Sequence, residues 1–231
     1  MAKKGYKKKQ KRISATKVTK ILRKENKFTI AALPGAHKKI ISVPLGIIIR
    51  DYLGLTKNLR NTKHILAKRK ILVNQKIRTS HKLPVGLFDV VSIPSEEKNY
   101  KVVFDRKGRL VMEETKNTKE KISKIVNRKI VKGNNLIAIT NDGLQIQDKN
   151  KKIKVGDSIK ISIPEGKLLA HYPLQKGSLV YIIAGKHAGE QAKILEMKEG
   201  SMTKPGLVLL EKKDNKFETI TKNIMVLGEK L

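Results

Sequence analysis

The fold of the first half of the chain is decided by one stretch, Ile65-Leu66-Ala67-Lys68-Arg69-Lys70-Ile71-Leu72-Val73-Asn74-Gln75-Lys76-Ile77-Arg78. It opens with helical spacing and then changes to the apolar run Ile71-Leu72-Val73, which favours a strand. Asparagine tolerates the backbone of a tight turn, so Asn74-Gln75-Lys76 followed by Ile77 indicates a β-hairpin. The stretch therefore predicts a basic helix that leads directly into a hairpin.

Two helices are predicted before this hairpin. The first, over residues 44–53, is bounded by Pro44 and Gly54 and carries one apolar face, made by Leu45, Ile48, Ile49, Tyr52 and Leu53. The second, over residues 56–69, places Leu59, Ile65 and Leu66 on one side. Its other side is basic and carries Lys57, Arg60, Lys63, His64 and Lys68.

Strands dominate the rest of the chain. Pro84-Val85-Gly86 leads into an apolar run at 90–93, which closes a small α+β module over residues 43–95. Turn signals such as Asn141-Asp142-Gly143 divide residues 96–170 into strands, which predicts a central β domain. Five short apolar runs predict a small SH3-like barrel over residues 171–231. The expected fold class is thus α+β and multi-module, with a basic N-terminal extension over residues 1–42.

The charge of the chain points to a polyanionic partner. The 231 residues hold 52 Lys or Arg and 20 Asp or Glu, a formal net charge of +32. Residues 1–80 hold 23 of the basic residues and two acids, Glu25 and Asp51. A basic gradient of this size is typical of nucleic-acid binding, because each phosphate that Lys or Arg neutralises releases counterions.

The first 24 residues are the most basic segment. They contain eleven Lys or Arg and no acid. Like charges repel, and the few apolar residues of this segment bury little surface, so we expect it to be disordered in the free protein and to order on phosphates.

Several function classes are disfavoured by composition. The chain has no cysteine, which excludes disulfides and thiolate metal sites. The N-terminus lacks the apolar core of a signal peptide, and no apolar run reaches the length of a membrane span. We therefore expect a soluble, intracellular protein that binds no membrane, small-molecule substrate, cofactor or metal. The histidines show no metal-ligand spacing and are interpreted as RNA contacts or surface residues: His37, His64, His81, His171 and His187.

Two segments resemble known families. Residues 43–93 resemble the RNA-binding domain named after ribosomal small-subunit protein four, on the stretch quoted above, although Gln75 stands where that hairpin usually has glycine. Residues 177–194, with Gly185-Lys186-His187-Ala188-Gly189, resemble a KOW motif. The order of parts, together with the stretches 82–93 and 125–127, resembles the archaeal and eukaryotic-type "four-e" family of small-subunit ribosomal proteins over residues 34–231.

The resemblance implies a structural constituent of the small ribosomal subunit in the cytoplasm, with rRNA and neighbouring ribosomal proteins as partners. Gly185 and Gly189 are expected to be structural glycines, because glycine allows positive φ and close backbone approach. With the basic residues identified from charge and position, the predicted RNA-binding residues are Lys3, Lys4, Lys7, Lys8, Lys9, Lys11, Arg12, Lys38, Lys39, Lys57, Arg60, Lys63, His64, Lys68, Arg69, Lys70, Lys76, Arg78, Lys186 and His187.

Two alternatives remain to be weighed. RNA pseudouridine synthases carry a similar RNA-binding module, but here Gly108-Arg109-Leu110 is followed by Val111 where those enzymes have a catalytic aspartate, so we expect no enzyme. The other alternative is a translation or transcription factor that binds RNA transiently and uses its KOW barrel for a protein partner. The charge of +32 favours a protein that stays bound to RNA over a factor that binds RNA transiently.

Overall fold

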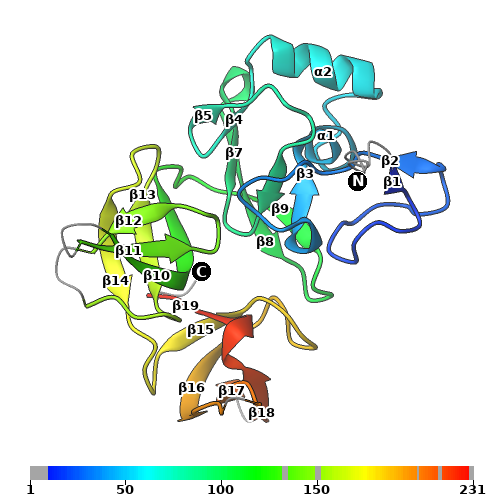
Figure 1. Ribbon diagram of the computed structural model, residues 1–231. Helices are drawn as coiled ribbons and strands as arrows, with labels where there is room; N and C mark the ends of the chain where they lie inside the picture. Colours follow the sequence, from blue (N-terminus) through cyan, green and yellow to red (C-terminus); the bar gives the residue numbers. More distant parts are fainter. Residues whose placement is uncertain (1–9, 132–134, 149–151, 202, 213–214, 229–231) are drawn as a thin grey trace, which may run out of the picture. The chain divides into compact units, whose positions relative to one another are not determined.

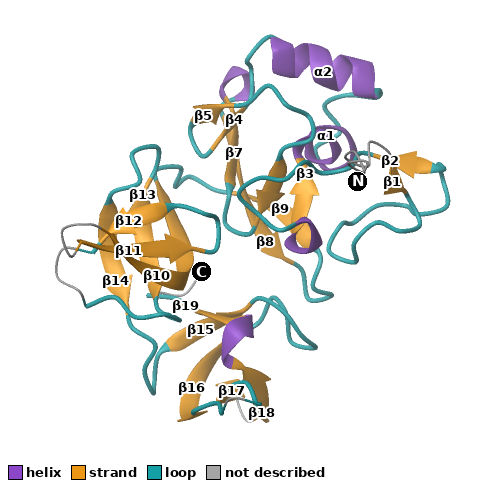
Figure 2. Ribbon diagram, in the orientation of Figure 1, coloured by secondary structure: helices purple, strands orange, loops and turns teal. Residues whose placement is uncertain are grey.

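A computed structural model describes residues 10–131, 135–148, 152–201, 203–212 and 215–228 (Figure 1). The chain divides into two compact units. Unit 1 comprises Met1–Val103 and Arg109–Thr118, and unit 2 comprises Phe104–Gly108 and Lys119–Leu231. The structure is mostly β, with few helices (Figure 2).

Unit 1 is built around a five-stranded sheet with the order β5-β4-β7-β8-β9. The strands are β4 (Leu72–Val73), β5 (Lys76–Ile77), β7 (Val90–Ile93), β8 (Lys98–Phe104) and β9 (Leu110–Glu114). Two smaller antiparallel pairs join β3 (Ser42–Pro44) to β6 (Pro84–Gly86), and β1 (Gln10–Lys11) to β2 (Phe28–Thr29). Short 3-10 turns lie at Lys39–Ile41 and Pro94–Glu96.

The first predicted helix forms, but its second half is π-helical. α1 (Leu45–Ile47) continues as a π-helical turn over Ile48–Tyr52, and Gly54 follows with a φ of 65°. The N–H groups of Leu45 and Gly46 donate to the carbonyl oxygens of Leu83 and His81 at 2.9 and 2.8 Å. The unpaired donors at the start of the helix are thus satisfied by the segment before β6.

The second predicted helix is α2 (Leu59–Ala67). It buries only Thr62 and Leu66 completely, which lie four residues apart on one face. Thr62 was not predicted as a buried residue. Its hydroxyl lies 2.7 Å from the hydroxyl of Thr56, so the polar atom is satisfied inside the protein.

The hairpin of β8 and β9 lies in unit 1, whereas the sequence placed it in a domain over residues 96–170. β7 is buried along its whole length, and it pairs with β4 on one edge and with β8 on the other. The expected boundary between residues 95 and 96 therefore falls in the tight turn between two paired strands.

Unit 2 contains two antiparallel five-stranded sheets. The first has the order β12-β11-β10-β13-β14 and consists of β10 (Glu120–Val131), β11 (Asn135–Thr140), β12 (Gln145–Gln147), β13 (Ser158–Ser162) and β14 (Leu168–Tyr172). The second has the order β18-β17-β16-β15-β19 and consists of β15 (Leu179–Ile182), β16 (Gln191–Lys198), β17 (Leu207–Lys212), β18 (Asn215–Ile220) and β19 (Ile224–Val226), with a 3-10 turn at Thr221–Asn223 before the last strand. Each sheet has its own apolar core.

The expectation of a disordered head is wrong for residues 10–24. The Arg12 side chain is buried and donates to the carbonyl oxygen of Leu22 and, at 2.9 Å, to Glu25. Arg23 donates to three backbone carbonyls, those of Ile13, Ala15 and Thr16. Arginine side chains that bind backbone carbonyls organise this segment, so their charge does not drive it apart. The predicted contacts Lys3, Lys4, Lys7, Lys8 and Lys9 lie outside the described residues.

Candidate nucleic-acid interface

The basic residues of α2 and of the following hairpin share one property, exposure to solvent. Because α2 buries so narrow a stripe, the rest of its surface is open. We call this set the α2 surface. Its members, all exposed, are Lys57, Arg60, Lys63, His64, Lys68, Arg69, Lys70, Lys76 and Arg78.

The α2 surface has no acidic counterpart nearby in the chain. No Asp or Glu occurs between Tyr52 and Phe88. The pKa of His81 is lowered by burial and by the positive charges of Lys63 and Lys82. Exposed cations without acidic neighbours generate a positive potential, which favours an anionic ligand.

Left-handed backbone occurs at one residue of this surface and at two residues of the hairpin turn beside it. Arg69, directly after α2, has a φ of 57°, a conformation in which glycine is usual at a helix end. Asn74 and Gln75 have φ values of 51° and 58°, which are those of a type I′ turn. β4 and β5 are thus joined by a two-residue hairpin although Gln75 replaces the usual glycine.

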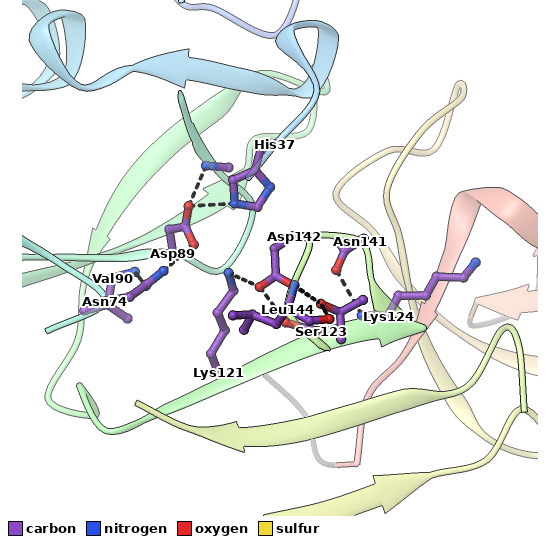
Figure 3. Close-up of polar contacts among 12 residues, drawn as sticks. His37, Asn74, Asp89, Val90, Lys121, Ser123, Lys124, Asn141, Asp142 and Leu144 are labelled. Atoms are coloured by element: carbon purple, nitrogen blue, oxygen red, sulfur yellow. Dashed lines mark hydrogen bonds and ion pairs between the residues drawn. The ribbon is translucent and has the colours of Figure 1, made fainter. Parts of the chain in front are cut away.

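A buried polar network fixes the hairpin to the rest of unit 1 (Figure 3). Asp89 accepts hydrogen bonds from the Asn74 side-chain amide and from the backbone N–H of Gly86, each at 2.8 Å. Asn74 in turn accepts a bond of 2.9 Å from the N–H of Val90. The network holds the turn of the hairpin at a defined place.

His37 belongs to the same network, although it was predicted as an RNA contact or a surface residue. Its Nε2 lies 2.8 Å from Asp89, and the side chain is 2% exposed. A Cβ on Gly86 would come within 2.4 Å of the imidazole ring, so only glycine fits beside it. His37 is therefore a buried structural residue, a role that its sequence position between Ala36 and Lys38 did not indicate.

The remaining predicted contacts of unit 1 divide into two groups. Lys11, Lys38 and Lys39 are exposed. Arg12 is not, because its guanidinium is used within the protein as described above. The structure therefore leaves Arg12 no free face for a ligand.

In unit 2, Lys186 is exposed and His187 is half-buried. The His187 ring stacks on Phe217 with centroids 4.2 Å apart, and its Nδ1 lies 3.3 Å from Glu190. Gly185 and Gly189 have φ values of 107° and 88°. A Cβ on Gly189 would lie 2.9 Å from the carbonyl oxygen of Asp105, which also belongs to unit 2. This glycine therefore meets both requirements, positive φ and close backbone approach.

The buried charges of unit 2 are paired with one another or with the backbone (Figure 3). Lys121 lies 2.6 Å from Asp142, and Ser123 donates to the same carboxylate at 3.0 Å. Lys124 donates to three backbone carbonyls. Within the described ranges, no group of His, Cys, Asp and Glu could hold a metal ion. Nor is any helix there long and apolar enough to cross a membrane.

Comparisons with known proteins agree with this arrangement. The sequence model of the family described as Ribosomal family S4e matches residues 85–168, and the KOW motif matches residues 176–199. Small ribosomal subunit protein eS4 of Methanocaldococcus jannaschii is 42% identical over 238 residues, which covers 99% of this chain and 97% of that protein. The protein of the same name from Archaeoglobus fulgidus is 38% identical over 221 residues, which covers 96% and 93%.

A solved structure is similar over most of the chain. The crystal structure of the 30S ribosomal protein S4e from Thermoplasma acidophilum superposes with a TM-score of 0.68 at 33% identity, and the match covers 81% of this chain and 95% of that one. The mostly β fold, the KOW motif across β15 and β16 and the exposed basic surface define a basic KOW protein. The chain belongs to the S4e family of ribosomal proteins, and the resemblance drawn from the sequence is confirmed.

Proposed function

We propose that the α2 surface binds rRNA phosphates in the small ribosomal subunit, of which this chain is a structural constituent. Like its family, the protein is not an enzyme and is located in the cytoplasmic ribosome. Its partners are rRNA and other ribosomal proteins.

One observation carries the proposal: nine basic or histidine side chains are exposed together on α2 and its hairpin, in a stretch of chain without a single acid. Lys and Arg that have no acidic neighbours gain most from phosphate, since contact releases the counterions that otherwise surround them. The left-handed Arg69 lies at the centre of this stretch. Strained backbone at an exposed cation supports a binding role, because such strain persists where function uses it.

We also propose how the chain divides into modules. The helices and the hairpin form an α+β RNA-binding module on residues 43–95, extended by the strands β8 and β9. Residues 119–170 form the central β domain, and residues 171–231 form an SH3-like KOW barrel. Lys186, Lys38, Lys39 and Lys11 are proposed as secondary phosphate contacts because they are exposed.

The experiment compares two triple variants that lose equal charge. Arg60→Ala with Lys63→Ala and Lys68→Ala removes three cations from the α2 surface. Lys176→Ala with Lys193→Ala and Lys204→Ala removes three exposed cations from unit 2. We expect the first variant to bind small-subunit rRNA more weakly, with Tm unchanged. The slope of log affinity against log salt concentration should become shallower by about three, one for each lost phosphate contact. Equal effects of the two variants would show that only net charge matters and would overturn the assignment.

A further inference from the structure

The strand β10 pairs with a different neighbour along each of its halves (Figure 1). Its first half pairs with β13, up to Lys124, and its second half pairs with β11, from Ile125 to Val131. Within the described residues, no strand pairs with the second half on the side of β13. We call residues 126–131, on that side, the β10 edge. An unpaired strand edge presents backbone donors and acceptors to which another chain can add a strand.

The bonds of the neighbouring strands show which way the backbone groups of the β10 edge point. The N–H of Asp148 donates to the carbonyl oxygen of Leu136, so Leu136 directs its backbone groups towards β12. Ile130 lies opposite Leu136 in the β10–β11 ladder. Opposite residues of an antiparallel pair either exchange both backbone bonds or direct these groups away from each other. Ile130 therefore points its N–H and C=O groups away from β11, to the open side of the edge.

Arg128, two residues earlier, has the same backbone orientation. Its N–H donates to the side-chain oxygen of Asn127 at 2.8 Å, which leaves its carbonyl oxygen on the edge. The ladder with β11 shifts its register at Val126. An extra residue of this kind bends a strand, and such bulges are common beside functional sites. The edge thus offers an acceptor at Arg128 and both a donor and an acceptor at Ile130, which is the spacing of a β-ladder.

Several side chains of the β10 edge are apolar and exposed. The exposed fractions are 53% for Val126, 74% for Ile130 and 45% for Val131. Ile130 and Val131 follow each other in a strand, so they project from opposite faces of the sheet. β-branched side chains on paired strands stabilise each other by contact. A segment added to this edge would therefore gain most from apolar residues of its own.

The charge of the β10 edge favours an acidic partner. No Asp or Glu occurs between Glu120 and Asp142. Arg128 and Lys129 belong to the edge, and the Nε of Arg128 is buried without a hydrogen-bond partner in the part of the chain that the structure describes. Opposite charges on paired strands stabilise the pairing, whereas two copies of this edge would bring like charges together. RNA has no backbone of alternating amide donors and carbonyl acceptors that could extend the ladder.

We infer that the β10 edge binds an extended segment of another small-subunit protein, one that contains both apolar and acidic residues. The segment pairs with the backbone of Ile130 and occupies the place beside β10 that β13 leaves open. Its acidic residues contact Arg128 and Lys129. The inference goes beyond the proposed function, because it adds a protein contact on unit 2 to the phosphate contacts of the α2 surface.

The test uses the absence of cysteine from the chain. Val131→Cys introduces a single thiol beside the edge, to which a photoreactive benzophenone is attached, and the full-length variant is assembled into small subunits. Irradiation should link it to one small-subunit protein, within a peptide that contains acidic and apolar residues. Leu169→Cys, at an exposed position of the outer strand β14, is the control and should not give this product.

A proline variant tests the backbone pairing. In the Val131→Cys background, Ile130→Pro removes the outward N–H and no bond of the β10–β11 ladder, and proline is tolerated at strand edges. We expect the yield of the crosslink to fall about tenfold. Ile130→Val keeps the N–H group and should leave the yield unchanged. Thermal unfolding of the two free variants checks that the sheet remains intact.

Charge reversal provides a second variant that does not depend on proline. Lys129→Glu should also lower the yield, whereas Lys176→Glu, at another exposed lysine of unit 2, should not. A crosslink to rRNA or to a second copy of this chain, or a protein crosslink that neither Ile130→Pro nor Lys129→Glu reduces, would contradict the inference and leave the proposed function standing. If the parent chain did not assemble into small subunits, both would fail.

Discussion

The ammonium of Lys124 donates a hydrogen bond of 2.6 Å to the carbonyl oxygen of Ile224. Two further bonds reach the carbonyls of Thr221 and Lys222 at 2.8 and 3.2 Å. Lys124 lies in β10 and Ile224 begins β19, so one side chain joins the two sheets of unit 2.

Removal of this ammonium should destabilise unit 2. Lys124→Met keeps an unbranched chain of similar length but leaves three carbonyls without their donor. We expect the free energy of unfolding to fall by about 1–3 kcal/mol, as measured by denaturant titration of the full chain. Lys193→Met, at an exposed position of β16, is the control and should unfold like the parent. An unchanged midpoint for Lys124→Met would mean that the packing of the two sheets does not need the lysine.

The same lysine should make stability depend on pH. Burial lowers the pKa of Lys124 from 10.5 to about 8. Between these values the unfolded chain binds more protons than the folded chain, so the free energy of unfolding should rise with pH. The difference between the parent and Lys124→Met isolates this effect, because other titrating groups cancel. A difference that is constant from pH 7 to 10.5 would contradict the shift.

Arg69→Gly should change stability and RNA affinity in opposite directions. Glycine removes the cost of the left-handed backbone, so we expect the free energy of unfolding to rise by about 0.5–1 kcal/mol. The loss of one exposed cation should at the same time weaken rRNA binding. Lys70→Gly, where the parent backbone is not left-handed, should lower both. Filter binding measures the rRNA affinity of the two variants, and thermal unfolding measures their stability. If the stability and the affinity of Arg69→Gly changed in the same direction, the left-handed backbone at Arg69 would have no role in RNA binding.

Arg23→Gln should release the N-terminal segment. The guanidinium donates bonds of 2.8, 2.9 and 3.2 Å to carbonyls of residues 13–16, and glutamine cannot reproduce this fork. We expect trypsin to cleave after Lys17 and Lys20 roughly tenfold faster, because the free energy of local opening of this segment becomes smaller. Lys24→Gln removes a neighbouring exposed charge and should leave the cleavage rate unchanged. Rapid cleavage of the parent itself would restore the expectation of a disordered head.

The sequence predicted elements whose determinants are local. The apolar spacing around Leu66 placed α2, and the turn signals of residues 141–143 placed the strands on either side of them. Asn74-Gln75 predicted a hairpin, while its turn type became clear only from the positive φ of both residues.

The determinants that were missed lie far apart in the chain. Lys124 sits in an alternating strand and was not singled out, because its acceptors follow about a hundred residues later. His37 gave no sign of burial, since its partner Asp89 comes from another element. In each case a distant partner reverses the usual preference of a polar side chain for water.

The position of β19 in the chain determines the order in which the two units can fold during synthesis. A nascent chain emerges from its N-terminus, and N-terminal domains generally fold first. Every residue of unit 1 has been synthesised by Thr118, so α2 and its hairpin can be complete before most of unit 2 has been made. Unit 2 has to wait, because β15 pairs with β19 and the acceptors of Lys124 lie about a hundred residues after it, at residues 221–224. A polypeptide released early, after Ile220, would therefore keep its basic face and leave a buried ammonium without its acceptors.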